Sequence, residues 1–186
     1  MEISEIKDNI FVKSIVTHNI IYASRLLAPK IVNILNTLNY NNLLDKEFIK
    51  LSDLLLIFDK ISFELGPSFL FNIGKTLPIS INFLDKKTHT LQQAIDLINN
   101  EYYEHNYIIN ADNLQKEKIL GKYSVVKYSD NSIILNSSTL YPCEFDKGLL
   151  YKICLQFHPG LSPNNIKHDL NCKENGNNNC TYHFIL

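Results

Sequence analysis

Apolar residues in the first half of the chain recur three and four positions apart, which is the spacing of one face of an α-helix. Residues 17–27 are rich in apolar side chains, and a second helix is expected to begin at Pro29, because proline fits the first turn of a helix. The apolar face of that second helix carries Ile31, Val32, Ile34, Leu35 and Leu38. The pattern therefore predicts two consecutive amphipathic helices.

Further helical segments are expected before residue 110. Ser52 is placed to cap a helix that Gly66 and Pro67 end. Residues 68–78 predict a short helix or turn that ends near Gly74 and Pro78. Thr88 or Thr90 begins a last helix, whose apolar face carries Leu91, Ala94, Ile95 and Ile98.

The second half of the chain changes to the alternation that is typical of strands. Residues 121–128 and 132–136 predict one hairpin, and residues 166–172 and 180–186 predict another, with a helix-like run between them that ends at Pro159-Gly160. This order predicts the α+β class: a helical N-terminal half packed on a four-stranded antiparallel sheet, with a ββ-α-ββ C-terminal half. We expect one domain over residues 1–186, in which residues 1–110 are mainly helical and residues 120–186 form the ββ-α-ββ part.

Composition excludes several classes of partner. Hydrophobic residues make up 45% of the 186 residues, which is ordinary for a globular protein. Eighteen basic and nineteen acidic side chains leave a net charge of −1, so nothing draws the whole chain toward nucleic acid. We find neither a secretory signal pattern nor an apolar run of about 18 residues, the length that a membrane span needs. We therefore expect a cytoplasmic protein without a membrane span or a nucleic-acid partner.

Two of the four cysteines, Cys172 and Cys180, bracket a polar loop in the last predicted hairpin. Side chains that face each other across an antiparallel pair lie close together, so these two thiols can meet. A metal site, free thiols and a disulfide are the three interpretations, and a cytosolic setting disfavours the disulfide. A closed metal site needs four ligands. Cys143 is a candidate for the third ligand, and His168 or Asp169 for the fourth; Cys154 lies in an apolar helix, where a thiol usually fills core space.

The stretches YPCEFDKG (141–148) and HDLNCKENGNNNCTY (168–182) resemble the C-terminal half of the 4-vinyl reductase domain family. Related domains are the sensors of bacterial regulators that detect phenols and other aromatic molecules. The resemblance implies that Cys143, Asp169, Cys172 and Cys180 bind a structural zinc ion beside a ligand pocket. The wider fold resembles that of haem–nitric-oxide-binding domains and of vesicle-tethering subunits of the Golgi.

An apolar ligand pocket is the second expected feature. Its candidate lining is Phe63, Phe69, Phe71, Ile73, Leu77 and Tyr103, although the same residues suit an ordinary core. Haem is a lower-ranked option, with His89 or His105 as the iron ligand. The haem-binding relatives use a Tyr-x-Ser-x-Arg motif, and Tyr22-Ala23-Ser24-Arg25 has the wrong spacing for it.

Catalytic motifs have little support in this sequence. Gly74-Lys75-Thr76 lacks the upstream glycine and strand of a phosphate-binding loop, and no serine lies in a nucleophile elbow. We therefore predict a non-enzymatic sensory or small-molecule-binding domain with structural zinc. Its expected partners are a small apolar or aromatic molecule and a second copy of the chain or another protein. The alternative is a protein–protein adaptor subunit.

Overall fold

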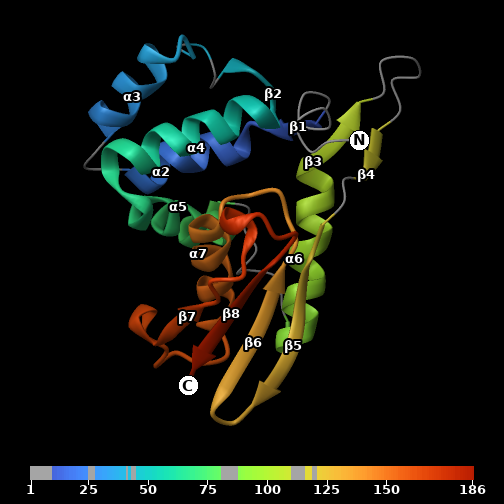
Figure 1. Ribbon diagram of the computed structural model, residues 1–186. Coiled ribbons are helices and arrows are strands. Elements are labelled where there is room, and N and C mark those ends of the chain that lie inside the picture. The colour runs from blue at the N-terminus through green and yellow to red at the C-terminus, as the bar shows by residue number, and fades with distance from the viewer. Residues whose placement is uncertain are drawn as a thin grey trace.

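The computed structural model describes residues 10–24, 28–40, 42, 45–80, 88–109, 116–118 and 121–186. Within this part of the chain the elements follow in the order β1 (Ile10–Lys13), α2 (Ile15–Ser24), α3 (Ala28–Thr37), β2 (Phe48–Lys50), α4 (Leu51–Leu65), α5 (Pro67–Ser80), α6 (Leu91–His105), β3 (Asn106–Ile109), β4 (Lys116–Lys118), β5 (Tyr123–Ser129), β6 (Ser132–Ser137), α7 (Cys143–Cys154), β7 (Ile166–His168) and β8 (Cys180–Ile185). The helices α2 to α5 gather at one end of the molecule, and the ββ-α-ββ part forms the other (Figure 1).

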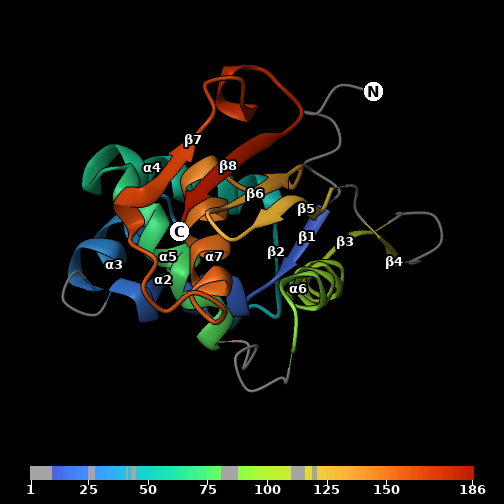
Figure 2. The ribbon, with the colours of Figure 1, turned by 90° about the horizontal axis from the view of Figure 1, so that it is seen from below.

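The C-terminal sheet has the strand order β5-β6-β8-β7 and is antiparallel throughout. Alternate residues of β6 and β8 are buried, including Leu135 and its register partner Tyr182. The helices α6 and α7 cover the inner face of this sheet (Figure 2). The predicted α+β class and the ββ-α-ββ order are therefore confirmed.

A second antiparallel sheet, with the order β2-β1-β3-β4, was not predicted. Its strands are three or four residues long. Phe11 of β1 faces Lys50 of β2 on one side and Tyr107 of β3 on the other, so β1 meets segments 39 and 96 positions further along the chain. In strands of three or four residues, the alternation of apolar and polar side chains is too short to be recognised in the sequence beside the neighbouring helices.

Several predicted helix boundaries need correction. Lys50, not Ser52, is the N-cap of α4, and no side chain caps this helix. Helix α5 continues past Gly74 to Ser80 and contains Pro78. Helix α7 ends at Cys154 rather than at Pro159-Gly160. In contrast, Thr90 does cap α6, through a reciprocal capping box with Gln93.

Helices α5 and α7 join the two halves of the molecule through a backbone-to-backbone contact. A Cβ atom at Gly74 would lie closer to the carbonyl oxygen of Phe145 than any real contact allows, and a Cβ atom at Gly148 would do the same to the carbonyl oxygen of Phe71. Each helix therefore needs a glycine at the point where it meets the other. Gly74 therefore serves the packing of α5 against α7 and does not mark the end of α5.

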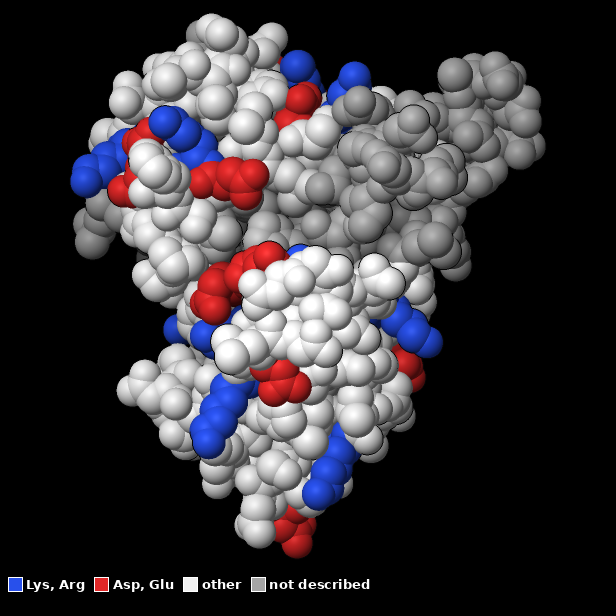
Figure 3. Space-filling model, viewed as in Figure 1, with Lys and Arg blue, Asp and Glu red and all other residues white. Residues whose placement is uncertain are grey.

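The described surface carries charges of both signs. Figure 3 shows lysines interspersed with Asp and Glu on the face in view, which agrees with a net charge of −1. None of the described helices combines the length and the apolar character that a bilayer crossing requires.

Candidate functional site

Four potential metal ligands meet where the last hairpin closes against the start of α7. They are Cys143, His168, Cys172 and Cys180, and their ligand atoms all lie within 4.8 Å of one another. The three cysteines are at most 2% exposed. The structure therefore brings these three cysteines together, although Cys143 and Cys180 are 37 positions apart.

The fourth member of this cluster is His168, whereas the resemblance implied Asp169. His168 faces Tyr182 in the β7–β8 register, and the two rings stack with centroids 4.9 Å apart. Asp169 points away and pairs with His183, whose Nε2 lies 3.1 Å from Asp169 Oδ1 on the outer face of the sheet. Neighbouring strand residues face opposite sides, so only one of the two side chains can reach the thiols. We use "Cys-His cluster" for Cys143, His168, Cys172 and Cys180.

Local structure explains how these residues are positioned. Cys180 begins β8 opposite Ser137 of β6, and Cys143 is the first residue of α7. The Tyr182 hydroxyl donates a hydrogen bond to the Cys143 carbonyl at 2.9 Å, which ties β8 to α7. The loop from Cys172 turns at Gly176, which has a φ of 85° and so occupies a conformation that glycine favours.

The electrostatics of the Cys-His cluster favour one thiolate. The sulfur atoms of Cys143 and Cys180 are 3.1 Å apart. The pKa of Cys180 is lowered to about 5, chiefly by the hydrogen bond from the Cys143 thiol and also by the backbone N–H of Lys173, against the opposing effect of burial. The same hydrogen bond and burial raise the pKa of Cys143. The pair therefore shares one proton and carries one negative charge near neutral pH.

Lys173, the residue after Cys172, extends its side chain into the core beneath α7. Its ammonium group lies 2.6 Å from Oδ2 of Asp146, which is completely buried. Asp146 also accepts hydrogen bonds from the hydroxyls of Tyr123, Ser137 and Thr139 at 2.5–2.8 Å. Burial alone would lower the pKa of Lys173, but the Asp146 carboxylate, together with Cys180 and Cys143, outweighs burial and raises it. The polypeptide segment that carries the thiols is thus fastened to a buried carboxylate.

The donor set suits a soft metal ion better than it suits catalysis. Three sulfur atoms and one imidazole can surround a metal ion tetrahedrally, and thiolates favour soft metals. The Nε2 atom of His168 is buried and has no hydrogen-bond partner among the described residues. Such an atom normally needs a partner, and a metal ion would supply one. Cys154 lies apart within α7, where burial raises the pKa of its thiol to about 12, as expected for core packing.

The six residues expected to line an apolar pocket do not come together. Phe63 is 85% exposed on α4, whereas Phe69 and Ile73 are buried in the core. Phe71 packs on Tyr151, and the hydroxyl of Tyr103 donates to the carbonyl of Gly121. Leu77 alone of these six lines the cavity described next.

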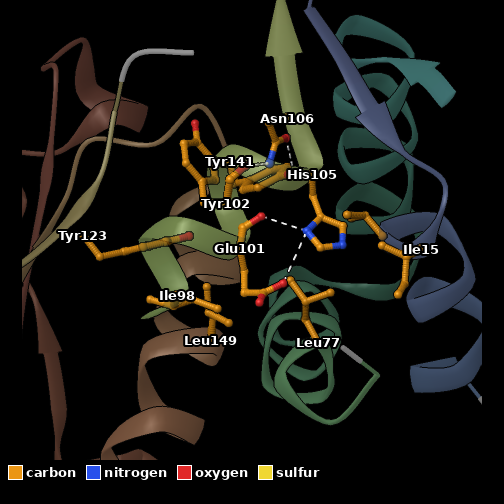
Figure 4. A pocket seen from close by; sticks show the side chains of 11 residues that line it. Ile15, Leu77, Ile98, Glu101, Tyr102, His105, Asn106, Tyr123, Tyr141 and Leu149 are labelled. Carbon is orange, nitrogen blue, oxygen red and sulfur yellow. Dashed lines mark hydrogen bonds and ion pairs between the residues drawn. The ribbon is translucent and has the colours of Figure 1, made fainter. Parts of the chain in front are cut away.

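This cavity lies between α2, α5, α6 and α7 and has a volume of about 30 Å³. Tyr102, Tyr141 and Leu149 form part of its wall, and His105 lies at one side next to Ile15 and Leu77 (Figure 4). The Nδ1 atom of His105 contacts the Glu101 carbonyl at 2.8 Å and the Glu101 carboxylate at 3.7 Å. A cavity needs about 10–15 Å³ to hold a water molecule, so this one suits one or two waters.

The other histidine considered for haem, His89, is exposed just before α6 and is absent from the cavity wall. Tyr22 is 45% exposed on α2, and Arg25 lies outside the described residues. Arg25 is also the only arginine in the sequence, and Ile21 and Ala23 precede it at the spacing of the Tyr-x-Ser-x-Arg motif. That motif is therefore absent from the chain.

Comparison with sequence families gives no assignment: no protein-family model matches this sequence, and no curated protein matches it. The resemblance to 4-vinyl reductase domains is thus not supported directly.

Solved structures show the fold. An H-NOX protein from S. oneidensis in the Fe(II) ligation state is similar at 18% identity, with a TM-score of 0.65 and coverage of 94% of this chain and 96% of that one. A second S. oneidensis H-NOX structure, in the Fe(II)NO state, has 16% identity, a TM-score of 0.62 and coverage of 94% and 99%. A structure that probes haem distortion in the H-NOX family has 13% identity, a TM-score of 0.61 and coverage of 93% of each chain. The chain therefore has an H-NOX-like fold.

These neighbours overturn zinc as the expected cofactor, because haem is the group named among them. The resemblance that implied zinc had pointed to a different family. Haem in turn does not fit the residues present: the cavity is about 30 Å³ and the Tyr-x-Ser-x-Arg motif is missing.

Proposed function

We propose that this chain is a non-enzymatic sensory domain whose responsive element is the Cys-His cluster, occupied by a soft transition-metal ion. One observation carries the proposal: three buried sulfur atoms and the unpartnered Nε2 of His168 lie within 4.8 Å of one another. Binding of a metal ion would hold the Cys172–Cys180 loop, β7 and the start of α7 together. Occupancy of the cluster would then control the order of this end of the molecule.

The sensory assignment draws on the H-NOX-like fold and on the position of the cluster. Lys173 connects the cluster loop to Asp146 in α7, and α7 packs on α5 through Gly74 and Gly148. A change at the cluster therefore acts on a helix that touches both halves of the molecule. An apolar ligand is not part of the proposal, since the apolar cavity beside His105 has a volume of about 30 Å³, far below the roughly 300 Å³ of a typical ligand pocket.

Titration of the tag-free, reduced and metal-free protein with Co²⁺ tests this proposal. Thiolate-bound Co²⁺ absorbs strongly in the near ultraviolet, and the visible bands report tetrahedral geometry. We expect saturation at one equivalent. Cys172→Ser and His168→Ala should weaken binding, by at least the roughly tenfold that the loss of a ligand or its support costs.

Two matched controls sharpen the measurement. Cys154→Ser changes a buried thiol outside the cluster, and Asp169→Asn changes the neighbour that points away; both should bind Co²⁺ as the unmodified chain does. Absence of one-equivalent binding in the unmodified chain would refute the proposal. Equal loss in Cys154→Ser and Cys172→Ser would show that the effect is unfolding, and a circular-dichroism spectrum of each variant distinguishes this from ligand loss.

A further inference from the structure

We infer that this chain keeps the architecture of the haem-binding H-NOX proteins without haem, because its own aromatic side chains fill the interior where a macrocycle would need space. The inference is independent of the metal proposed for the Cys-His cluster. It is carried by the packing of the core, by the small space in front of His105 and by the pairing of buried hydrogen-bond donors with the Asp146 carboxylate.

The interior is filled by a continuous group of aromatic rings. Tyr141 lies at its centre, with ring centroids 4.8 Å from Phe145, 5.9 Å from Tyr102 and 6.5 Å from Phe58. All four rings are at most 5% exposed. They come from α4, α6 and α7 and the turn before α7, so they occupy the space between the helical half and the sheet. The cavity beside Tyr102 and Tyr141 has a volume of about 30 Å³, roughly a tenth of a small ligand pocket.

The phenol groups of this aromatic core are held by specific partners. The Tyr141 hydroxyl donates to Asn106 Oδ1 at 2.6 Å, and the Asn106 amide donates to the Tyr102 carbonyl at 2.7 Å. The backbone N–H of Leu140 donates to the Tyr102 hydroxyl at 3.4 Å. Burial raises the pKa of both Tyr102 and Tyr141, so both rings stay neutral. Opening space for a macrocycle would break these bonds as well as the packing.

Neither the space in front of His105 nor the described hydrogen-bond donors near the aromatic core suit haem. His105 is the only histidine at the cavity wall, and the space before it holds water-sized molecules. Haem carries two propionates, which need cationic or hydroxyl partners when buried. Lys173, whose ammonium group donates to the Tyr141 carbonyl at 2.8 Å, already pairs with Asp146, and the hydroxyls of Tyr123, Ser137 and Thr139 donate to the same carboxylate. The carboxylate of Asp146 thus already accepts the hydrogen bonds that a buried propionate would need.

Hemin titration of the tag-free chain, residues 1–186, tests the inference, with a solved haem-binding H-NOX protein carried through the same procedure as a positive control. We expect no absorption band that saturates at one equivalent, in the ferric or the reduced state. We also expect no rise in melting temperature with added hemin, since a ligand that binds the native state would raise it.

Variants at His105 and His89 separate specific from adventitious binding. Weak, unsaturable hemin partitioning that is equal in the unmodified chain, His105→Ala and His89→Ala supports the inference. Saturation at one equivalent overturns it, whether or not either substitution removes the band. A melting curve of the hemin-free protein establishes in each case that the chain was folded.

Discussion

The ammonium group of Lys173 lies 2.6 Å from the buried carboxylate of Asp146, so the loop that carries Cys172 and Cys180 is anchored in the core of the molecule. Lys173 also donates to the carbonyls of Thr139 and Tyr141 at 3.0 and 2.8 Å. One side chain therefore connects the Cys-His cluster, the turn before α7 and α7 itself. This connection leads to the first prediction.

Lys173→Met should destabilise the protein by about 3 kcal/mol, because it leaves the charge of Asp146 buried without a cation. The measurement is the free energy of unfolding in urea at neutral pH. Lys167→Met, an exposed lysine on β7, is the matched control and should change stability by less than about 0.5 kcal/mol. Equal effects of the two substitutions on the free energy of unfolding would show that the Lys173–Asp146 pair stabilises the protein no more than an exposed lysine does.

Cys143→Ser and Cys180→Ser should loosen the same hairpin, although the two residues are distant in sequence. Each removes one of the two sulfur atoms that lie 3.1 Å apart, so each should raise the hydrogen-exchange rate of the amides in residues 169–180. Cys154→Ser should leave exchange in that segment unchanged. If only Cys180→Ser has an effect, Cys143 does not belong to a working cluster.

The stability of the metal-free protein should rise with pH between about 5 and 9 through Cys180. Its pKa is lowered to about 5 in the folded chain, from 9.0 for an ordinary thiol. In this window the unfolded chain binds the proton that the folded chain has released, so stability increases with pH and is lost as pH falls through 5. The measurement compares the unfolding free energy of the unmodified chain and Cys180→Ser at several pH values, and parallel curves would contradict the prediction.

Gly148→Ala should destabilise the protein, even though alanine is the better helix former by about 1 kcal/mol. The added Cβ would collide with the backbone carbonyl of Phe71, which no side-chain rotation relieves, and such overpacking costs about 1–3 kcal/mol or more. Gly160→Ala is the control, since its Cβ would meet nothing within 4 Å. Thermal unfolding of the two variants gives the sign directly; a higher melting temperature for Gly148→Ala would exclude the close contact between α5 and α7.

Thr90→Ala and Ser52→Ala should differ, although the sequence makes both residues look like helix caps. Thr90 accepts a hydrogen bond from Gln93 N at 3.2 Å, so its removal should cost about 1 kcal/mol. Ser52 lies inside α4 and caps nothing, so its replacement should be neutral or slightly favourable. Chemical denaturation measures both values, and a larger cost for Ser52→Ala would contradict the assigned start of α4.

The sequence predicted the parts of the fold that local pattern determines. Thr90 and the apolar face from Leu91 to Ile98 define α6, and the alternation in β6 and β8 defines the last sheet. The three clustered cysteines followed from hairpin geometry and a family resemblance. Asp169, which the resemblance implied as the fourth ligand, lies outside the cluster and pairs with His183. Strand alternation alone had allowed either His168 or Asp169 to face the thiols.

The features that were missed depend on tertiary contacts. The sheet of β1 to β4 joins strands of three or four residues, too short to show a period. The role of Lys173 depends on Asp146, 27 positions earlier, and no local signal connects a loop lysine with a helix aspartate. The residues expected to line a pocket together with Phe63 lie apart in the structure. Apolar positions of a helix look alike in sequence, whether they face a cavity, the core or solvent.

The reciprocal glycine contact between α5 and α7 also limits how this protein can move. Gly74 and Gly148 bring the two backbones so close that neither helix can slide along the other without its neighbouring side chains colliding. Rotation about the point of contact is the motion that remains. Gly74 and Gly148 would therefore act as a pivot, and a disturbance at the base of α7 would reach the helical half as a change of angle rather than of distance.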